Sequence, residues 1–246
     1  MNNDIEKLRI DKEYYTGVGK KYLSNSDIGT LLKNPKEFGK VSEDNINFAK
    51  GRLFHQLILE PNKAEESIKN AVDVSSRNTK AYKERVEEKG GGFLLLTKEV
   101  EEMNRLTKVM LSNIDFFDLI KAEENIYEEP AIGKVKGLMW KGKADIVASD
   151  CLIDLKTTSD INKFKWSARD YNYDSQAYIY ELLFGKPLIF LVIDKSTGAL
   201  GKFTPSEDFL VRGEEKVEKA IEVYDKFFNP KKENYNINNY YIDTEL

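Results

Sequence analysis

Two carboxylates in the middle of the chain lie among apolar residues that are typical of buried strands. Asp145 lies in the run Ala-Asp-Ile-Val and Asp154 in the run Leu-Ile-Asp-Leu. Side chains two apart on a strand share a face, so Asp154 and Lys156 point the same way. A turn near Ser149-Asp150 would bring Asp145 opposite Asp154 in an antiparallel pair. Burying such acids is unfavourable unless a charge compensates them, and a hard divalent cation such as Mg²⁺ would do so.

A second interpretation of these residues needs no chemistry. Asp154 and Lys156 would then form an ordinary ion pair, and Asp145 would mark the end of a strand. Charged residues make up 33% of the chain, so an Asp-x-Lys triplet is common by chance. The apolar residues on both sides of each acid favour a functional site, because a buried acid needs a compensating charge.

The chain has one histidine, His55, and it lies in a predicted helix among Leu53, Phe54 and Leu57. Gly51 precedes it by one turn and leaves room on that face. A neutral imidazole is a competent metal ligand and suits Mn²⁺ better than Mg²⁺. The alternative role is that of a core histidine satisfied by one hydrogen bond.

Gln176 and Tyr180 are four residues apart and therefore share one face of a predicted helix. Amphipathic packing explains the neighbouring Tyr178 and Leu182. It does not require a glutamine and a tyrosine on one stripe, so this pair is a further candidate for a functional role.

Turn residues and hydrophobic periodicity divide the chain into helices around a strand-rich middle. The predicted helices cover residues 24–32, 47–59, 97–114, 161–168, 174–184 and 206–228. The predicted strands cover residues 125–135, 138–140, 143–148, 152–157, 188–194 and 200–204. Strands with helices before and after them indicate an α/β fold with a mixed sheet.

Length and composition indicate one domain that spans residues 1–246. Within it, residues 1–22 are predicted to form a peripheral segment, and residues 62–96 a mobile insertion with the glycines 90–92 near its end. No apolar run has the length of a signal peptide or a membrane span, so we expect a cytoplasmic protein without a membrane partner. The single cysteine, Cys151, excludes an internal disulfide and a four-cysteine iron–sulfur cluster within this chain.

The net charge of −4 argues against a protein that coats nucleic acid through bulk positive charge. The segment 131–170 nevertheless has eight basic and five acidic residues, so a phosphodiester could be held there locally. The basic residues that could contact phosphates are Lys134, Lys136, Lys141, Lys143, Lys163, Lys165 and Arg169. The alternative role of each one is solvated surface.

Four motifs follow one another in an order that resembles the PD-(D/E)xK nuclease superfamily. They are the Gly-x-x-x-His helix that ends at His55, the Gly-Lys-Ala-Asp-Ile-Val run around Asp145, the Ile-Asp-Leu-Lys-Thr-Thr run around Asp154, and the Gln-x-x-x-Tyr pair. The resemblance covers roughly residues 22–228 and is closest to the RecB-type branch and the phage and prophage exonuclease VIII family. It implies a restriction-endonuclease-like core, in which helices flank a central mixed β-sheet, with helical additions at the N-terminus.

The resemblance assigns roles to the matching residues. Asp145, Asp154 and Lys156 correspond to the catalytic residues. His55, Asp145, Asp154 and the backbone carbonyl of Leu155 correspond to the metal ligands. The implied cofactor is Mg²⁺ or Mn²⁺, without an iron–sulfur cluster.

Three further residues match accessory positions of the superfamily. Gln176 and Tyr180 correspond to a pair that contacts DNA or orients catalytic groups, and Glu129 resembles an accessory acid of some members.

The implied function is that of a metal-dependent deoxyribonuclease, an exonuclease that hydrolyses phosphodiester bonds from the ends of double-stranded DNA in phage-type recombination or repair. The alternatives are an endonuclease on the same fold and a non-catalytic or weakly active DNA-binding module of a phage replication or recombination complex. Family analogy adds a single-strand annealing recombinase as a partner and a ring-like homo-oligomer as an assembly, although no residue specifies either.

Overall fold

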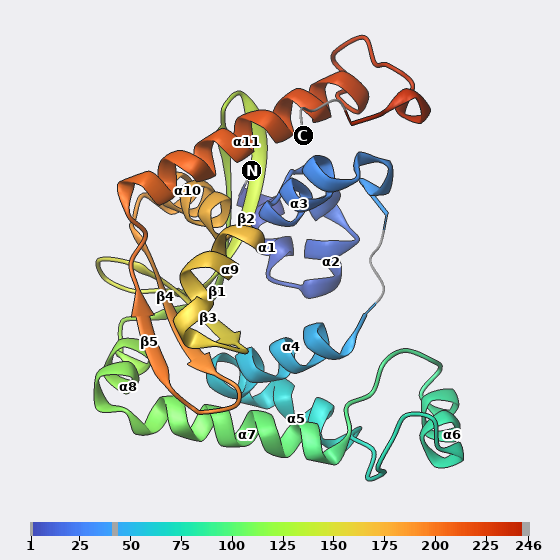
Figure 1. Ribbon diagram of the computed structural model, residues 1–246, viewed down its shortest axis with the longest axis vertical. Helices are drawn as coiled ribbons and strands as arrows, with labels where there is room; N and C mark the ends of the chain where they lie inside the picture. Colours follow the sequence, from blue (N-terminus) through green and yellow to red (C-terminus); the bar gives the residue numbers. More distant parts are fainter. Residues whose placement is uncertain (1, 41–43, 243–246) are drawn as a thin grey trace.

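The computed structural model describes residues 2–40 and 44–242, and its centre is a five-stranded mixed sheet (Figure 1). The strands follow in sequence order: β1 (Ile126–Val135), β2 (Leu138–Val147), β3 (Leu152–Thr158), β4 (Leu188–Asp194) and β5 (Leu200–Phe203). β3 and β4 run parallel, and the other neighbouring pairs are antiparallel. The predicted α/β fold with a mixed central sheet is therefore confirmed.

Helices cover both faces of this sheet (Figure 1). One face is covered by α4 (Ile46–Leu59), α5 (Pro61–Lys69), α7 (Thr97–Ser112) and α8 (Ile114–Lys121). The other face is covered by α3 (Asn25–Lys33), α9 (Phe164–Asp170), α10 (Tyr173–Phe184) and α11 (Glu207–Phe227). The remaining elements are α1 (Asn2–Leu8), α2 (Asp11–Tyr15), α6 (Lys80–Glu88) and the 3₁₀ turns η1 (Val18–Lys21), η2 (Pro35–Glu37), η3 (Ile161–Lys163) and η4 (Ile237–Asn239).

Side chains that alternate along the central strands form two apolar layers, one on each face of the sheet. On β3, Ile153 and Leu155 pack toward α4 and α7, whereas Leu152 packs toward α10. β4 is buried at every residue, because helices cover both of its faces. Even positions of β3, among them the predicted site residues, therefore belong to the α10 side of the sheet.

β2 is one continuous strand, so the prediction of two strands at 138–140 and 143–148 was wrong. Gly142, taken as a break, lies inside it. A Cβ atom at Gly142 would lie 2.9 Å from the ring of Tyr180 and 3.1 Å from Leu183 on α10. The glycine therefore allows the strand and α10 to approach closely and does not end the strand.

The helix predicted for residues 97–114 ends at Ser112. Asn113 Oδ1 accepts a hydrogen bond from the Phe116 N–H at 3.0 Å and so caps a separate helix, α8. Apolar residues continue through both helices, and this continuity concealed the break.

The N-terminal residues pack on the outer strands through α1, α2 and η1. Leu8 and Tyr14 are buried against Ile132 of β1. The ammonium of Lys141 on β2 donates a hydrogen bond to the Tyr14 carbonyl at 2.5 Å. Among the residues that the structure describes, no helix combines the length and the apolar character that crossing a membrane requires.

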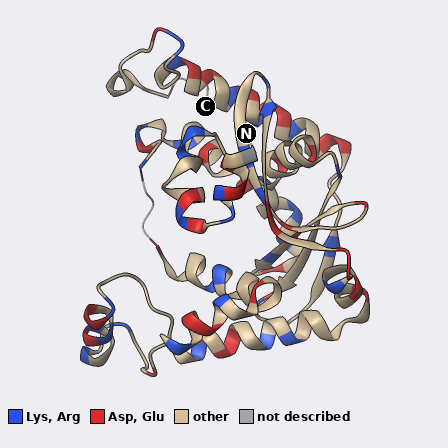
Figure 2. Cartoon of the chain, turned by 180° about the vertical axis from the view of Figure 1, so that it is seen from behind, with Lys and Arg blue, Asp and Glu red and all other residues tan. Residues whose placement is uncertain are grey.

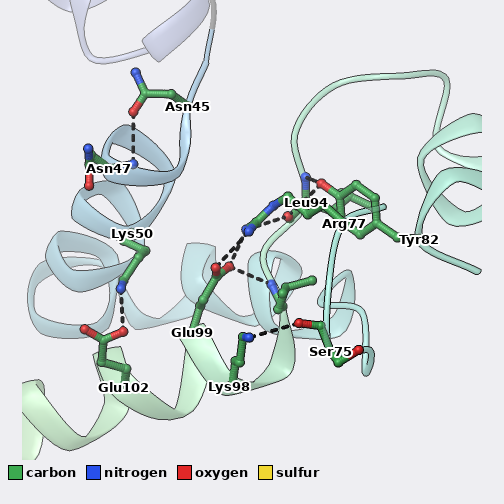
Figure 3. A network of polar contacts seen from close by, with 11 residues as sticks. Asn45, Asn47, Lys50, Ser75, Arg77, Tyr82, Leu94, Lys98, Glu99 and Glu102 are labelled. Atoms are coloured by element: carbon green, nitrogen blue, oxygen red, sulfur yellow. Dashed lines mark hydrogen bonds and ion pairs between the residues drawn. The ribbon is translucent and has the colours of Figure 1, made fainter. Parts of the chain in front are cut away.

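The predicted insertion, residues 62–96, contains most of α5 and all of α6 and is attached to α7 by polar contacts (Figure 3). Arg77 forms an ion pair with the buried carboxylate of Glu99 on α7. Lys98 Nζ donates a hydrogen bond to the Ser75 carbonyl at 3.0 Å. These contacts fix the base of the segment, and its mobility stays a prediction.

Candidate active site

The two acids singled out in the sequence meet where β2 and β3 separate. Backbone pairing joins Ile146 to Ile153, so the register places Asp145 opposite Asp154, in agreement with the predicted turn. Beyond that pair, Asp145 Oδ2 accepts a hydrogen bond from the Leu155 N–H at 2.7 Å. A side chain thus takes the place of a backbone bond between the strands, and the sheet opens around this carboxylate.

The alternation of side chains between the two faces of the sheet is interrupted in β2 at Asp145. Ala144 packs in the α10 layer and Ile146 in the α4 layer, although residues two apart on a strand normally share a face. Glu128 on β1 lies at the level of Asp145, where the register skips one pair, and has a φ of 51°, an uncommon value for a residue other than glycine. Backbone strain of this kind is concentrated at functional sites. Here the strained residue, Glu128, lies beside Asp145, whose side chain contacts both Leu155 of β3 and His55 of α4.

His55 reaches the site from α4 and contacts both strands. Its Nε2 lies 2.9 Å from the Leu155 carbonyl oxygen, and its Nδ1 lies 3.3 Å from Asp145 Oδ1. Burial by itself lowers the pKa of His55, but the Asp145 carboxylate outweighs burial and raises that pKa to about 9. The imidazole is therefore protonated at neutral pH without a cation, and both ring N–H groups donate.

Lys156 and Gln176 hold Asp154 from two sides. The Lys156 ammonium lies 3.0 Å from Asp154 Oδ1 and 2.5 Å from Oδ2, and the Gln176 amide donates to Oδ1. Burial by itself lowers the pKa of Lys156, yet the Asp154 carboxylate outweighs burial and holds the pKa above its usual range. The Lys156 side chain therefore stays an ammonium beside the acids.

Tyr180 binds the backbone of β2 at Lys143, two residues before Asp145. Its hydroxyl donates to the Lys143 carbonyl at 3.1 Å and lies 3.3 Å from the Lys143 N–H. Gln176 and Tyr180 share one face of α10 as predicted, and both are buried. Gln176 contacts the Asp154 carboxylate and Tyr180 contacts the backbone of β2, so both could orient groups of the site; which of the two predicted roles they have stays a prediction.

The structure brings Glu128, not the predicted Glu129, to the cluster. One ligand atom each from His55, Glu128 and Asp145 lie within 4.8 Å of one another. Glu129 instead accepts two hydrogen bonds from Arg9 of the N-terminal segment, at 2.5 and 2.9 Å. The pairing of Val135 with Leu138 puts residue 128 at the level of residue 145, but it does not tell which of the two glutamate side chains turns toward the acids.

The carboxylate of Glu128 lies in an electrostatically unfavourable position. Burial, and after it the neighbouring Asp145 carboxylate, raise the pKa of Glu128 to about 7. A cation beside these acids would relieve both effects.

These groups fit a hard divalent cation. Carboxylate oxygens are the ligands that Mg²⁺ prefers, and an imidazole beside them also suits Mn²⁺. Asp154 lies opposite Asp145 but is not one of the three residues whose ligand atoms lie within 4.8 Å of one another. Its buried Oδ2 pairs with the Lys156 ammonium at 2.5 Å. The Leu155 carbonyl, the remaining predicted ligand, is occupied by His55.

A cavity of about 550 Å³ lies beside α4 and α5, and Gln56, Lys63 and Leu95 are among the residues that line it. His55, Glu128, Asp145, Asp154 and Lys156 are not among its lining residues. This cavity is therefore not part of the candidate site.

Several of the basic residues that the sequence offered for phosphate contact form ion pairs or hydrogen bonds with other residues of the protein. These interactions are the ion pairs Lys136–Glu218 and Lys143–Asp11 and the hydrogen bond from Lys141 to the Tyr14 carbonyl. Figure 2 shows basic and acidic residues interspersed along the helices. Contact with a polyanion would therefore depend on local groups and not on one broad basic face.

Comparison with known proteins agrees with this geometry. A family model described as a "PDDEXK-like domain of unknown function (DUF3799)" matches residues 21–237. The crystal structure of a protein from Eubacterium rectale, titled "Putative exonuclease", aligns with a TM-score of 0.63 at 16% sequence identity, over 87% of this chain and 85% of that one. At this identity the likeness shows a common fold.

Two other comparisons add no functional information. The crystal structure of SSO0001 aligns with a TM-score of 0.38 at 13% identity, over 89% of this chain and 86% of that one. No curated protein matches the chain in sequence. The resemblance to the PD-(D/E)xK superfamily is confirmed, whereas closeness to the exonuclease VIII branch stays a prediction. Because its model covers most of the sequence, the chain belongs to the family of PDDEXK-like domains of unknown function.

Proposed function

We propose that this protein is a metal-dependent nuclease that hydrolyses phosphodiester bonds in DNA. The observation that carries the proposal is the meeting of Asp145, Asp154 and Lys156 where β2 and β3 part, with His55 and Glu128 beside them. A structural ion pair would need one acid and one base. A histidine and two acids whose ligand atoms lie within 4.8 Å of one another, with Asp154 opposite one of them, fit a cation site better.

Each residue has a distinct task in this proposal. His55, Glu128, Asp145 and Asp154 would hold a divalent cation, which supplies Lewis-acid polarisation of the phosphate and a more acidic bound water. The Lys156 ammonium offsets negative charge that develops on the phosphate. Gln176 fixes the Asp154 carboxylate, and Tyr180 fixes the strand that carries Asp145.

Within this proposal, the substrate is the end of double-stranded DNA and the reaction serves phage-type recombination or repair. Two observations support it. The sequence motifs resemble those of the exonuclease VIII family, and the Eubacterium rectale protein that shares this fold is described as a "Putative exonuclease". A single-strand annealing recombinase as partner and a homo-oligomeric ring belong to the same proposal.

The decisive experiment follows three labelled DNAs with Mg²⁺, Mn²⁺ or EDTA: a linear duplex, a single strand and a covalently closed circle. An exonuclease degrades the linear duplex with either metal, leaves the circle intact and has no activity in EDTA. Cleavage of the circle would identify an endonuclease on the same site. Absence of hydrolysis in both metals, while metal still binds, would identify a DNA-binding module.

Binding of a divalent cation is expected to stabilise the folded protein. Mg²⁺ or Mn²⁺ at about 100 times its dissociation constant adds about 2.7 kcal/mol to the free energy of unfolding. For a chain of this size, that shift raises the melting temperature by roughly 5–10 °C. Thermal unfolding with and without EDTA measures the shift, and an equal shift in Ca²⁺ would not contradict the site. An unchanged melting temperature in all three metals would contradict it.

The two adjacent glutamates of β1 form a matched pair of variants. Glu128→Gln is expected to weaken cation affinity by about 10- to 100-fold, because it removes a carboxylate from the cluster. Glu129→Gln removes only the exposed ion pair with Arg9, which contributes less than about 1 kcal/mol to stability and nothing to cation affinity. Metal titration followed by calorimetry separates the two. Equal affinities in the two variants would show that Glu128 is not a ligand.

A further inference from the structure

An exposed aromatic ring, that of Tyr171, lies one ring away from the lysine of the candidate site. The Lys156 ammonium sits 4.6 Å from the centre of the Tyr173 ring, and that ring lies 5.9 Å from the ring of Tyr171. Tyr173 is partly buried, but Tyr171 is 67% exposed. One aromatic ring therefore separates Lys156 from an open aromatic face.

The turn that carries Tyr171 is held in an unusual conformation. Asn172, between α9 and α10, has a φ of 59° and a ψ of 37°, in the left-handed region. Asn25 of α3 donates to its backbone carbonyl at 3.0 Å, and Lys216 of α11 donates to its side-chain oxygen at 3.0 Å. A strained residue persists only where its surroundings over-determine it. Two neighbouring helices therefore fix the position of Tyr171 beside Tyr173.

A second exposed ring lies on the helix that carries His55. Phe48 of α4 is 55% exposed, and it shares a helix face with His55, two turns later. Between them, a Cβ atom on Gly51 would meet no other atom within 4 Å, so this face of α4 is open. α4 and α10 cover opposite faces of the sheet, so Phe48 and Tyr171 belong to segments on opposite sides of it.

We propose that the DNA strand crossing this site is unpaired, with one base stacked on Tyr171 and another on Phe48. The inference rests on the proposed nuclease function and names the form of its substrate. Bases inside a duplex stack on one another and present no free face, and the last pair presents only one, whereas an unpaired base can stack on an aromatic side chain without regard to sequence. Rings on two sides of the sheet therefore fit an unpaired strand better than a closed duplex end. At a duplex end, the terminal nucleotides of the cut strand would separate from their partners to reach Lys156.

Binding of a fluorescein-labelled oligothymidylate tests the inference without requiring hydrolysis. In the Asp154→Asn background with Mg²⁺, Tyr171→Ala is expected to raise the dissociation constant by about 5- to 150-fold, and Phe48→Ala by a similar factor. Tyr171→Phe keeps the ring and is expected to bind as the Tyr171 protein does. An unchanged dissociation constant for Tyr171→Ala would overturn the inference.

A distant tyrosine supplies the matched control. Tyr235 is 66% exposed and follows α11, which ends at Phe227. The α9–α10 turn instead packs near Gly213, where a Cβ atom would touch the Asp174 carbonyl. About 20 Å of helix separates the two places, so Tyr235→Ala is expected to leave binding unchanged. An equal loss in Tyr235→Ala and Tyr171→Ala would overturn the inference, because it would show a non-specific effect.

Abasic DNA separates stacking from other contacts. On an oligonucleotide whose terminal positions lack bases, wild type and Tyr171→Ala are expected to bind equally, since no base remains to stack. A loss in Tyr171→Ala that persists on abasic DNA would overturn the stacking role. If base-dependent binding is found but no metal supports hydrolysis, the nuclease proposal fails while the unpaired-strand inference stands.

Discussion

Replacement of Asp154 by asparagine is expected to lower the rate of phosphodiester hydrolysis by about 10²- to 10⁴-fold. The carboxylate lies opposite Asp145 and is held by Lys156 and Gln176. Asparagine keeps the shape and an acceptor oxygen but removes the negative charge that a divalent cation needs. The initial rate on end-labelled linear DNA at saturating Mg²⁺ measures the effect, and thermal unfolding establishes that the variant is folded.

The control is Asp150→Asn, in the exposed turn that joins the same two strands. It changes the net charge equally and is expected to leave the rate unchanged. If Asp154→Asn cleaved DNA as fast as the wild type, Asp154 would have no part in catalysis, and the ordinary ion-pair interpretation of Asp154 and Lys156 would be favoured.

Replacement of Lys156 by methionine is expected to lower the hydrolysis rate by about 10²- to 10³-fold, the usual effect of removing one group that stabilises transition-state charge. Methionine has a similar length and packs against apolar groups. Because an ammonium cannot coordinate a metal, the increase in melting temperature on adding Mg²⁺ should remain. Loss of activity with metal binding retained would distinguish Lys156 from the acids.

Lys156→Arg tests whether positive charge alone suffices. Arginine keeps the charge but spreads it over a planar group, so we expect partial activity between those of wild type and Lys156→Met. A Lys156→Met protein that no longer binds Mg²⁺ would contradict the assignment, since the lysine would then support the cation site itself.

The sequence was most informative where the relevant geometry is local. Alternation along β3 placed Asp154 and Lys156 on one face, and the turn at Ser149-Asp150 determined which residue of β2 lies opposite Asp154. Helical periodicity likewise placed Gln176 and Tyr180 on one face of α10. These relations depend on backbone repeat distances, which are the same in every protein.

The sequence was misleading where a residue type has more than one use. Gly142 resembled a strand break, but it lies where α10 passes close to β2. Lys141 and Lys143 resembled phosphate contacts, but α2 and its neighbouring residues occupy both of them. Each outcome depends on an element that is distant in the sequence and whose position periodicity does not report.

The sequence by itself predicted that Asp145, Asp154 and Lys156 lie together, because their relative positions follow from strand and turn geometry. Only the tertiary structure decided which glutamate joins them. Arg9, more than a hundred residues away, binds Glu129, and the strained backbone at Glu128 belongs to the point where β2 changes its facing. The tertiary structure also decided that His55 reaches Asp145 and the Leu155 carbonyl, since these contacts require α4 to pack across β3. Long-range packing sets such distances, and no local repeat encodes them.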